Sequence, residues 1–214
     1  MESKRSELLR ASPRMFDNEL LDRFTRVHHL IPLAIFLPAI ALLLYLGFDR
    51  LGNGVVLLLA LGGYAFWSLA EYWIHRMIFH WEPEQGWGAR LHWMIHGVHH
   101  DHPNDPLRLV MPPSVSIPLS ALFVWGFVLV LGTPDAYPFA AGFLAGYLLY
   151  DMIHFALHHY RPRSAFGRWL RELHMRHHFQ DDTRGFGIAA PYWDFIFRTR
   201  VDRAQRAAAA PHED

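Results

Sequence analysis

The chain has 214 residues, no cysteine, and equal numbers of basic and acidic side chains, 20 of each, so that its formal net charge is zero. This balance gives no sign of a basic surface for nucleic acid, and we expect no nucleic-acid partner. The absence of cysteine excludes disulfides, thiolate metal ligands and cysteine nucleophiles. Two features stand out instead, namely 16 histidines and several long apolar stretches.

Residues 1–29 place apolar side chains such as Leu8, Leu20 and Phe24 between charged ones. This alternation is typical of an amphipathic segment that lies at the membrane–water interface. Packing of the same side chains against the rest of the protein explains the pattern equally well, so both interpretations stay open.

Four apolar stretches follow, and each is long enough to cross a bilayer, which takes about 20 residues. Few charges interrupt them, which disfavours the alternative of buried helices in a soluble protein. The sequence therefore predicts an all-α integral membrane protein with four transmembrane helices, in one domain that we place at residues 30–203. The four stretches are residues 30–48, 54–79, 114–132 and 136–159, and the alanine-rich residues 204–214 are typical of a disordered tail.

The basic residues predict how this domain is oriented in the membrane. The connections after the first and third stretches are short, and Arg50 is the only basic residue in them. All other Lys and Arg lie in the N-terminal segment, from the end of the second stretch to the start of the third, or after the fourth. Because cytoplasmic segments are enriched in basic residues, we expect both termini and the histidines on the cytoplasmic side.

Ten of the histidines form four clusters on this side. Residues three or four apart share one face of a helix, so the members of the last three clusters can point to one place. The five-residue spacing of the first cluster requires the helix to end or distort before its second histidine, and the Trp-Glu-Pro sequence that follows favours such an ending. The clusters are His75 and His80; His96, His99 and His100; His154 and His158; and His174, His177 and His178.

Neutral imidazole is a good ligand for zinc, iron and copper. Ten imidazoles are too many for one ion, so the clusters predict a dinuclear site with about five ligands for each metal. A single histidine on an apolar face is more often a hydrogen-bonded core residue. Four clusters on one side of the membrane, two of them with the same His-x-x-His-His pattern, make a metal site the better interpretation.

Four further residues are candidates for supporting this site. Ligand histidines normally donate their second ring nitrogen to an acceptor such as a carboxylate. Glu71 and Asp151 lie four and three residues before a clustered histidine, so a helix brings each of them close to it. A plain interhelical hydrogen bond is the alternative for both carboxylates. His92 and His159 lie beside the clusters, as supporting groups or spare ligands.

The residues around the histidines carry a resemblance to a known family. EYWIHRMIFH, HGVHHDHPNDPLRLVMPP, YDMIHFALHHYRP and RHHFQDDTRGFGIAAPYWDFIF lie in this order within residues 71–197. They resemble the fatty acid hydroxylase branch of the sterol desaturase and fatty acid hydroxylase superfamily, and within it the fatty acid 2-hydroxylases, which hydroxylate sphingolipid acyl chains. The histidines alone indicate only the superfamily, whereas RLVMPP and the later aromatic run are particular to this branch.

The resemblance implies a helical membrane anchor with a cytoplasmic helical cap and a metal pair between them. It assigns the ligand role to all ten clustered histidines, iron as the active metal and dioxygen as co-substrate, while zinc could replace iron in purified protein. Related proteins commonly carry a fused cytochrome b5 domain, for which the 29 residues before the first span are too few. We therefore expect a separate electron donor, cytochrome b5-like or ferredoxin-like.

The function that the resemblance implies is a dimetal, O₂-dependent monooxygenase that hydroxylates C2 of a long acyl chain, in a lipid such as ceramide or in a free fatty acid. The alternatives are a sterol or carotenoid hydroxylase, or a desaturase, of the same superfamily. A zinc-binding membrane transporter fits less well, because its ligands should lie near the bilayer midplane.

The surroundings of the site are less well specified by the sequence. The composition, rich in arginine and alanine, favours the cytoplasmic membrane of a bacterium. Several side chains are candidates for the mouth through which the lipid enters between cap and membrane, although packing or interfacial anchoring could explain each one. They are Arg108, Trp93, Tyr160, Phe179, Phe186 and Trp193.

Overall fold

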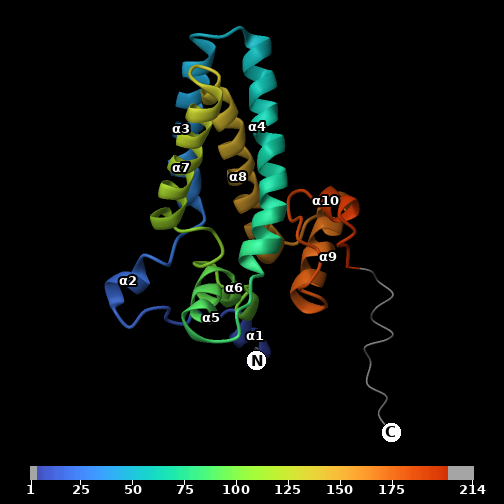
Figure 1. The fold of residues 1–214 in the computed structure, drawn as a ribbon. Helices are drawn as coiled ribbons and strands as arrows, with labels where there is room; N and C mark the ends of the chain where they lie inside the picture. The colour runs from blue at the N-terminus through green and yellow to red at the C-terminus, as the bar shows by residue number, and fades with distance from the viewer. Residues whose placement is uncertain (1–3, 202–214) are drawn as a thin grey trace.

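Four long apolar helices form the membrane-spanning part of the computed structural model, which describes residues 4–201 (Figure 1). They make two hairpins whose short connections lie at the same end of the bundle. Within the described residues all regular structure is helical, and the predicted four-span, all-α fold is confirmed. The spans are α3 (Leu30–Phe48), α4 (Asn53–Ile74) with its continuation η1 (His75–Phe79), α7 (Pro113–Leu131) and α8 (Ala136–His159).

Helix α8 is the centre of the bundle, because it packs against each of the other three spans. Of its most apolar stretch 72% is buried, compared with 6% for α7. Glycines allow α4 and α8 to approach each other closely. A Cβ atom at Gly142 would lie 1.8 Å from the carbonyl oxygen of Ala60, and one at Gly63 would lie 1.9 Å from that of Phe139. These two glycines therefore set the separation of two helices that both carry histidines at their ends.

Shorter helices form a cap at the end of the bundle opposite the short connections (Figure 1). One half of the cap follows the second span and the other half follows the fourth. In Figure 1 these halves lie on opposite sides of the lower end of α4. The first half contains α5 (Gly86–His92), η2 (Trp93–Gly97) and α6 (Val98–Asp101), and the second contains α9 (Ala165–Phe179) and α10 (Tyr192–Ile196).

The second span ends in a π-helix, η1, in which backbone hydrogen bonds join residues five apart. The His80 N–H donates to the His75 carbonyl oxygen at 3.1 Å. In an α-helix, with 3.6 residues per turn, side chains five apart would point about 140° away from each other. The wider π turn brings them towards the same side, so the distortion that the sequence required between these histidines is present. The second π-helix, η2, had no such signal in the sequence.

The N-terminal segment contains α1 (Lys4–Leu9) and α2 (Glu19–Arg23) and packs against the cap. The Val27 N–H donates to the Leu107 carbonyl oxygen at 2.7 Å. Phe24 is nevertheless 59% exposed. The segment therefore packs against the cap, and its position at the membrane–water interface stays a prediction. The domain limits at residues 29 and 203 stay predictions, and the tail at residues 204–214 lies outside the described residues.

We expect Gly142→Ala to destabilise the bundle, because its Cβ would meet the backbone of α4 and the helices would have to separate. Overpacking of this kind costs about 1–3 kcal/mol or more. Thermal unfolding in detergent measures the effect, and Gly126→Ala on α7, where a Cβ meets nothing within 4 Å, is the matched control. Equal melting temperatures for the two variants would contradict the close approach of α4 and α8.

Candidate metal centre

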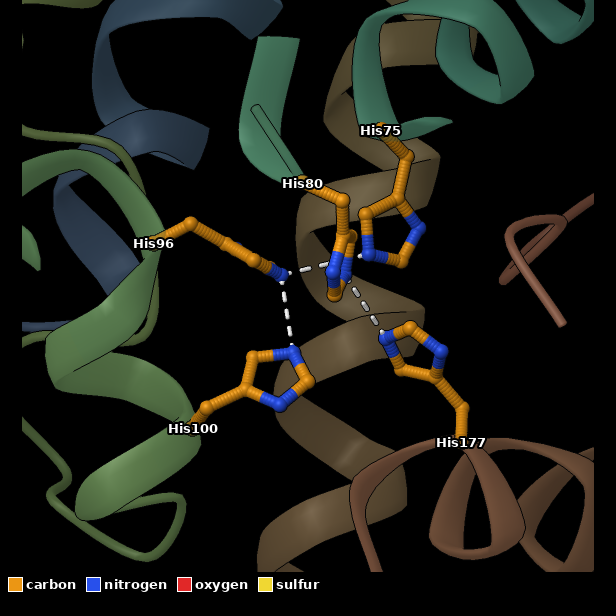
Figure 2. A group of neighbouring side chains, drawn as sticks. All are labelled: His75, His80, His96, His100 and His177. Carbon is orange, nitrogen blue, oxygen red and sulfur yellow. Dashed lines mark hydrogen bonds between the residues drawn. The ribbon is translucent and has the colours of Figure 1, made fainter. Parts of the chain in front are cut away.

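Five histidines from three distant parts of the sequence meet below the end of α4 (Figure 2). His75 and His80 come from the end of the second span, His96 and His100 from η2 and α6, and His177 from α9. The Nε2 atom of His96 lies 3.2 Å from that of His75 and 3.0 Å from that of His100, and the Nε2 atoms of His80 and His177 are 3.1 Å apart. One ligand atom of each ring lies within 4.8 Å of all the others. We call these five the first group.

The other five clustered histidines form a second group with the same compactness. They are His99, His154, His158, His174 and His178, and their ligand atoms also lie within 4.8 Å of one another. The Nε2 atoms of His158 and His174 are 2.7 Å apart, and that of His99 lies 2.9 Å from His154 and 3.0 Å from His178. The structure thus brings all ten clustered histidines together, in two groups of five.

The spacing of the ring nitrogens fits two bound metal ions. A nitrogen ligand lies about 2.1 Å from an ion such as zinc, so two ligands at right angles are about 3.0 Å apart. The neighbouring Nε2 atoms of both groups are 2.7 to 3.2 Å apart. Hydrogen bonding explains the geometry less well, because a ring nitrogen carries either one proton or one lone pair, and His96 Nε2 faces two other Nε2 atoms.

Main-chain carbonyls orient two rings of the first group. His75 Nδ1 donates to the Phe186 carbonyl oxygen and His177 Nδ1 donates to that of Arg184, each at 2.7 Å. Because a carbonyl oxygen only accepts, Nδ1 carries the proton and Nε2 keeps its lone pair. Both lone pairs therefore face the other histidines, which is the arrangement that a metal ligand needs.

The imidazoles of the cap are held in the neutral form. Burial, together with repulsion from the neighbouring rings of His177 and His92, lowers the pKa of His80 from 6.5 to about 3. Neutral rings keep a lone pair available at physiological pH, so the groups can bind cations although they consist of basic residues. The same two causes lower the pKa of four more rings well below the ordinary value, those of His96, His99, His174 and His178.

The segment that carries Phe186 is fixed in turn by Asp194 of α10. The two carboxylate oxygens of Asp194 accept hydrogen bonds from the N–H groups of Phe186 at 2.9 Å and Gly187 at 2.8 Å. The Thr199 hydroxyl also donates to this carboxylate, at 2.7 Å. Asp194 thus acts on His75 through one intervening peptide, a role that nothing in the local sequence indicates.

Glu71 supports the same segment, and the prediction that it supports a ligand histidine directly is wrong. Its Oε1 atom accepts the Ala189 N–H at 2.7 Å, while the nearby ring of His75 donates to the Phe186 carbonyl oxygen instead. The carboxylate is 3% exposed, so it needs hydrogen bonds, and the free N–H groups of the loop supply them.

Asp151 also has a different role from the predicted support of His154. Its Oδ2 atom accepts a hydrogen bond from the Tyr147 hydroxyl, one turn earlier on α8, at 3.0 Å. The backbone of Met111, in the segment before α7, provides a further hydrogen bond. Asp151 therefore joins α8 to the start of α7, which is the structural alternative that the sequence left open.

The two supporting histidines lie outside both groups. His92 lies beside the first group, where the Oε1 atom of Glu82 is 3.9 Å from His92 Nε2 and 3.5 Å from His80 Nδ1. Glu82 was not predicted, although its place two residues after His80 was a usable signal. The ring of His159 stacks on Phe155 at 4.3 Å, because one residue turns it about 100° away from His158. It is therefore not a spare ligand in this structure.

Comparison with known proteins agrees with this centre. Residues 60–199 match the fatty acid hydroxylase family, and this range includes all ten histidines of the two groups. The chain belongs to this family. The resemblance that the sequence motifs indicated is thereby confirmed.

Individual relatives show how far the similarity extends. The chain is 35% identical over 190 residues to the dihydroceramide fatty acyl 2-hydroxylase FAH2 of Arabidopsis thaliana, a match that covers 87% of this chain and 79% of that protein. It is 40% identical over 140 residues to the ceramide very long chain fatty acid hydroxylase SCS7 of Saccharomyces cerevisiae, covering 64% of this chain and 36% of the yeast protein. A solved structure of Scs7p, in which only the hydroxylase domain is visible, matches with a TM-score of 0.83 and 32% identity, over 93% of this chain and 74% of that chain.

Arg108 is buried in this member of the family, so its predicted place in a substrate mouth is wrong. Its side chain is 2% exposed and lies 3.0 Å from the Asp22 carboxylate and 3.8 Å from that of Asp105. Burial alone would raise the pKa of Asp22, but hydrogen bonds from the Met15 N–H, Arg108 and Arg26 outweigh it and hold the pKa at about 2. The guanidinium therefore fastens the N-terminal segment to the cap.

Two of the predicted mouth aromatics are packing residues instead. Phe186 is 4% exposed, and its ring lies edge-on to that of His80, 5.5 Å away, so it closes one side of the first group. Trp193 donates its indole N–H to the Ser68 hydroxyl at 3.3 Å and thereby joins α10 to α4. Both side chains are therefore occupied within the protein and do not form an opening.

The other three aromatics lie nearer the surface. Trp93 donates its indole N–H to Asp101 at 3.0 Å, within the cap. Tyr160 is 58% exposed and Phe179 is 49% exposed. Phe179 lies beside His178, with ring centroids 6.0 Å apart, and a role of Trp93, Tyr160 and Phe179 at the substrate mouth stays a prediction.

We expect Asp194→Ala to weaken metal binding by about tenfold, because the Phe186 carbonyl that orients His75 would lose its support. Metal content after dialysis against a chelator, measured by elemental analysis, tests this. The exposed Asp17→Ala variant is the control for removal of a carboxylate. Metal retention equal to that of the unmodified protein would show that the segment holds its shape without Asp194.

We expect Arg108→Ala to lower stability by about 3–5 kcal/mol, because buried Asp105 would lose its ion pair with Arg108 and Asp22 would lose one of its two arginine partners. The KM for lipid substrate should stay unchanged in the folded fraction. Thermal unfolding and steady-state kinetics measure the two effects, with the exposed Arg23→Ala as control. A raised KM at an unchanged melting temperature would instead place Arg108 in contact with substrate.

Proposed function

We propose that the chain is a dimetal, O₂-dependent fatty acyl 2-hydroxylase that inserts one oxygen atom at C2 of a long acyl chain. The observation that carries this proposal is the pair of adjacent five-histidine groups. Neighbouring residues serve different groups, since His100 and His177 belong to the first and His99 and His178 to the second. The rings of His100 and His178 stack at 4.2 Å, so the two groups are in contact.

We infer that the native ions are iron. Imidazole nitrogen is a good ligand for iron, and the activation of oxygen needs a redox-active metal, which zinc is not. When bound, the metal pair supplies the reductive activation of dioxygen that no side chain can perform. The overall reaction consumes one dioxygen, two electrons and two protons, leaves one oxygen atom on C2 and releases the other as water. Zinc can occupy the same ligands in purified protein, because it binds nitrogen more tightly than Fe(II) does.

The chain's own residues perform three tasks in this reaction. Ten imidazoles, of which those in the cap have lowered pKa values, offer lone pairs rather than protons to the centre. The Phe186 and Arg184 carbonyls fix the direction of two of these lone pairs. Burial of His75 and His177, which are 1% and 0% exposed, keeps bulk water away from the reacting atoms.

The proposed substrate is the acyl chain of a ceramide-type lipid or of a free fatty acid. The plant and yeast relatives are named for dihydroceramide and ceramide acyl chains, which supports this class over sterols and carotenoids and supports hydroxylation over desaturation. A zinc transporter is disfavoured, because the histidines of the second and fourth spans lie in the last turns of those spans rather than midway along them.

We further propose that the cap faces the cytoplasm, because the arginines gather at that end of the bundle. Both termini would then be cytoplasmic. Two electrons per turnover would come from a separate cytochrome b5-like or ferredoxin-like protein on the same side. Location in a bacterial cytoplasmic membrane stays a prediction from composition.

The decisive experiment is expression in a host that supplies a reduced donor, followed by mass spectrometry of the hydrolysed acyl chains. We expect 2-hydroxy fatty acids whose new oxygen derives from isotopically labelled dioxygen. His177→Ala should abolish the product, because it removes a ligand of the first group. His28→Ala, which changes an exposed histidine outside both groups, should leave it unchanged.

Two results would contradict the proposed function. One is the absence of hydroxylated chains from protein that holds two irons and receives electrons from the donor. The other is a hydroxyl group at a carbon other than C2. Either outcome would favour one of the alternative reactions of the same superfamily.

A further inference from the structure

A groove of about 890 Å³ lies along α9, outside both histidine groups. Its lining combines charged and apolar side chains, and none of its arginines has a part in holding the histidines. Four arginines and one glutamate contribute to it, together with the exposed ring of Phe179. The charged residues are Arg161, Arg168, Arg171, Arg176 and Glu172.

The groove has a net positive charge. Among the described residues that line it, four arginines stand against one acidic residue, Glu172. That carboxylate forms an ion pair with Arg176 one turn later on α9. Arg161 and Arg168 are exposed to solvent, and Arg168 donates to the Arg163 carbonyl oxygen, so that its guanidinium is held at the groove. The groove would therefore attract an acidic protein surface electrostatically.

Helix α9 lies between this groove and His177 of the first group, whereas His178 of the second group lies beside the groove residue Phe179. At about 100° per residue, Arg168, Met175 and Phe179 point within one sector of about 40° on α9, whereas His177 points to the opposite side. One contact leads inwards from the groove, because the Phe179 ring lies beside the ring of His178, with centroids 6.0 Å apart.

We propose that this groove is the docking site for the acidic face of a one-electron carrier protein. The inference rests on the proposed function, because hydroxylation needs two electrons that neither dioxygen nor the acyl chain supplies. Each reduced carrier is oxidised by one electron as the metal centre gains it, so two encounters serve one turnover. The proposed partner at this groove is therefore an acidic redox protein.

The shape and composition of the groove favour a protein over a lipid headgroup. Arginine, methionine and aromatic side chains are enriched in protein interfaces, and Arg168, Met175 and Phe179 provide all three. Arg168 and Arg176 lie about two turns apart on α9, so the positive charge is spread along the helix. A lipid phosphate is better matched by arginines that converge on one point. An electron donor also has to bind close to the metal ligands, and α9 carries three of them. Binding of a lipid headgroup has no such requirement.

The test uses metal-loaded protein in nanodiscs of neutral lipid and a soluble cytochrome b5 domain of net negative charge as the probe. The double variant Arg161→Glu/Arg168→Glu reverses two exposed charges without touching a histidine. We expect its Kd for the probe to rise about tenfold or more at low salt, and the rate of probe oxidation to fall in parallel. Arg14→Glu/Arg23→Glu, which also reverses two exposed charges but in the N-terminal segment, is the matched control and should bind as the unmodified protein does.

Two outcomes would overturn the docking site. The double variant could bind the probe with unchanged Kd, or the unmodified protein could bind equally well to a probe whose carboxylates have been esterified. In the first case, loss of co-purifying phosphatidylglycerol from the double variant would identify a lipid headgroup site instead. Because binding is measured without acyl substrate, an unmodified protein that binds and oxidises the probe but makes no 2-hydroxy product would sink the proposed function and leave the docking site standing.

Discussion

Ten imidazole rings can share one buried region only if each stays neutral and each inward-facing nitrogen has a partner. A proton on one ring would be penalised both by loss of water and by repulsion from the next proton. Rings such as His96 and His99 each face two other Nε2 atoms, more than hydrogen bonding can satisfy. A metal ion meets both demands, because it accepts several lone pairs and brings no proton. The surrounding fold accordingly orients the imidazole rings so that their lone pairs point towards the metal sites.

Helix periodicity explains how a short repeated motif serves two ions. In the first His-x-x-His-His motif, His96 and His100 join the first group while His99 joins the second. In the motif on α9 the division is reversed, with two histidines for the second group and one for the first. The second span, bent by its π turn, adds two ligands to the first group, and α8 adds two to the second. Each group thus reaches five ligands from three parts of the chain, and each motif alone is insufficient.

The histidines were predictable from the sequence and their supports were not, for one physical reason. Ligand spacing is a local property, since residues three and four apart share a face of any helix, and so the ten clustered histidines could be found. The supports depend on contacts between distant segments. Glu71 bonds a residue 118 positions away and Arg108 one 86 positions away. A buried carboxylate takes whichever donors the tertiary structure offers, and its sequence neighbours do not reveal which these are.

The same distinction applies to α9, which connects the centre to the outside of the protein. Its sequence contains three histidines and three arginines. The packed structure shows that the histidines belong to the two groups and that the arginines line a groove. His177 serves the first group while His174 and His178 serve the second, so α9 contacts both. An electron delivered at this helix would therefore reach a helix that carries ligands of both ions. A donor on α9 needs no separate route to each metal, whereas α4 reaches the first group and α8 the second.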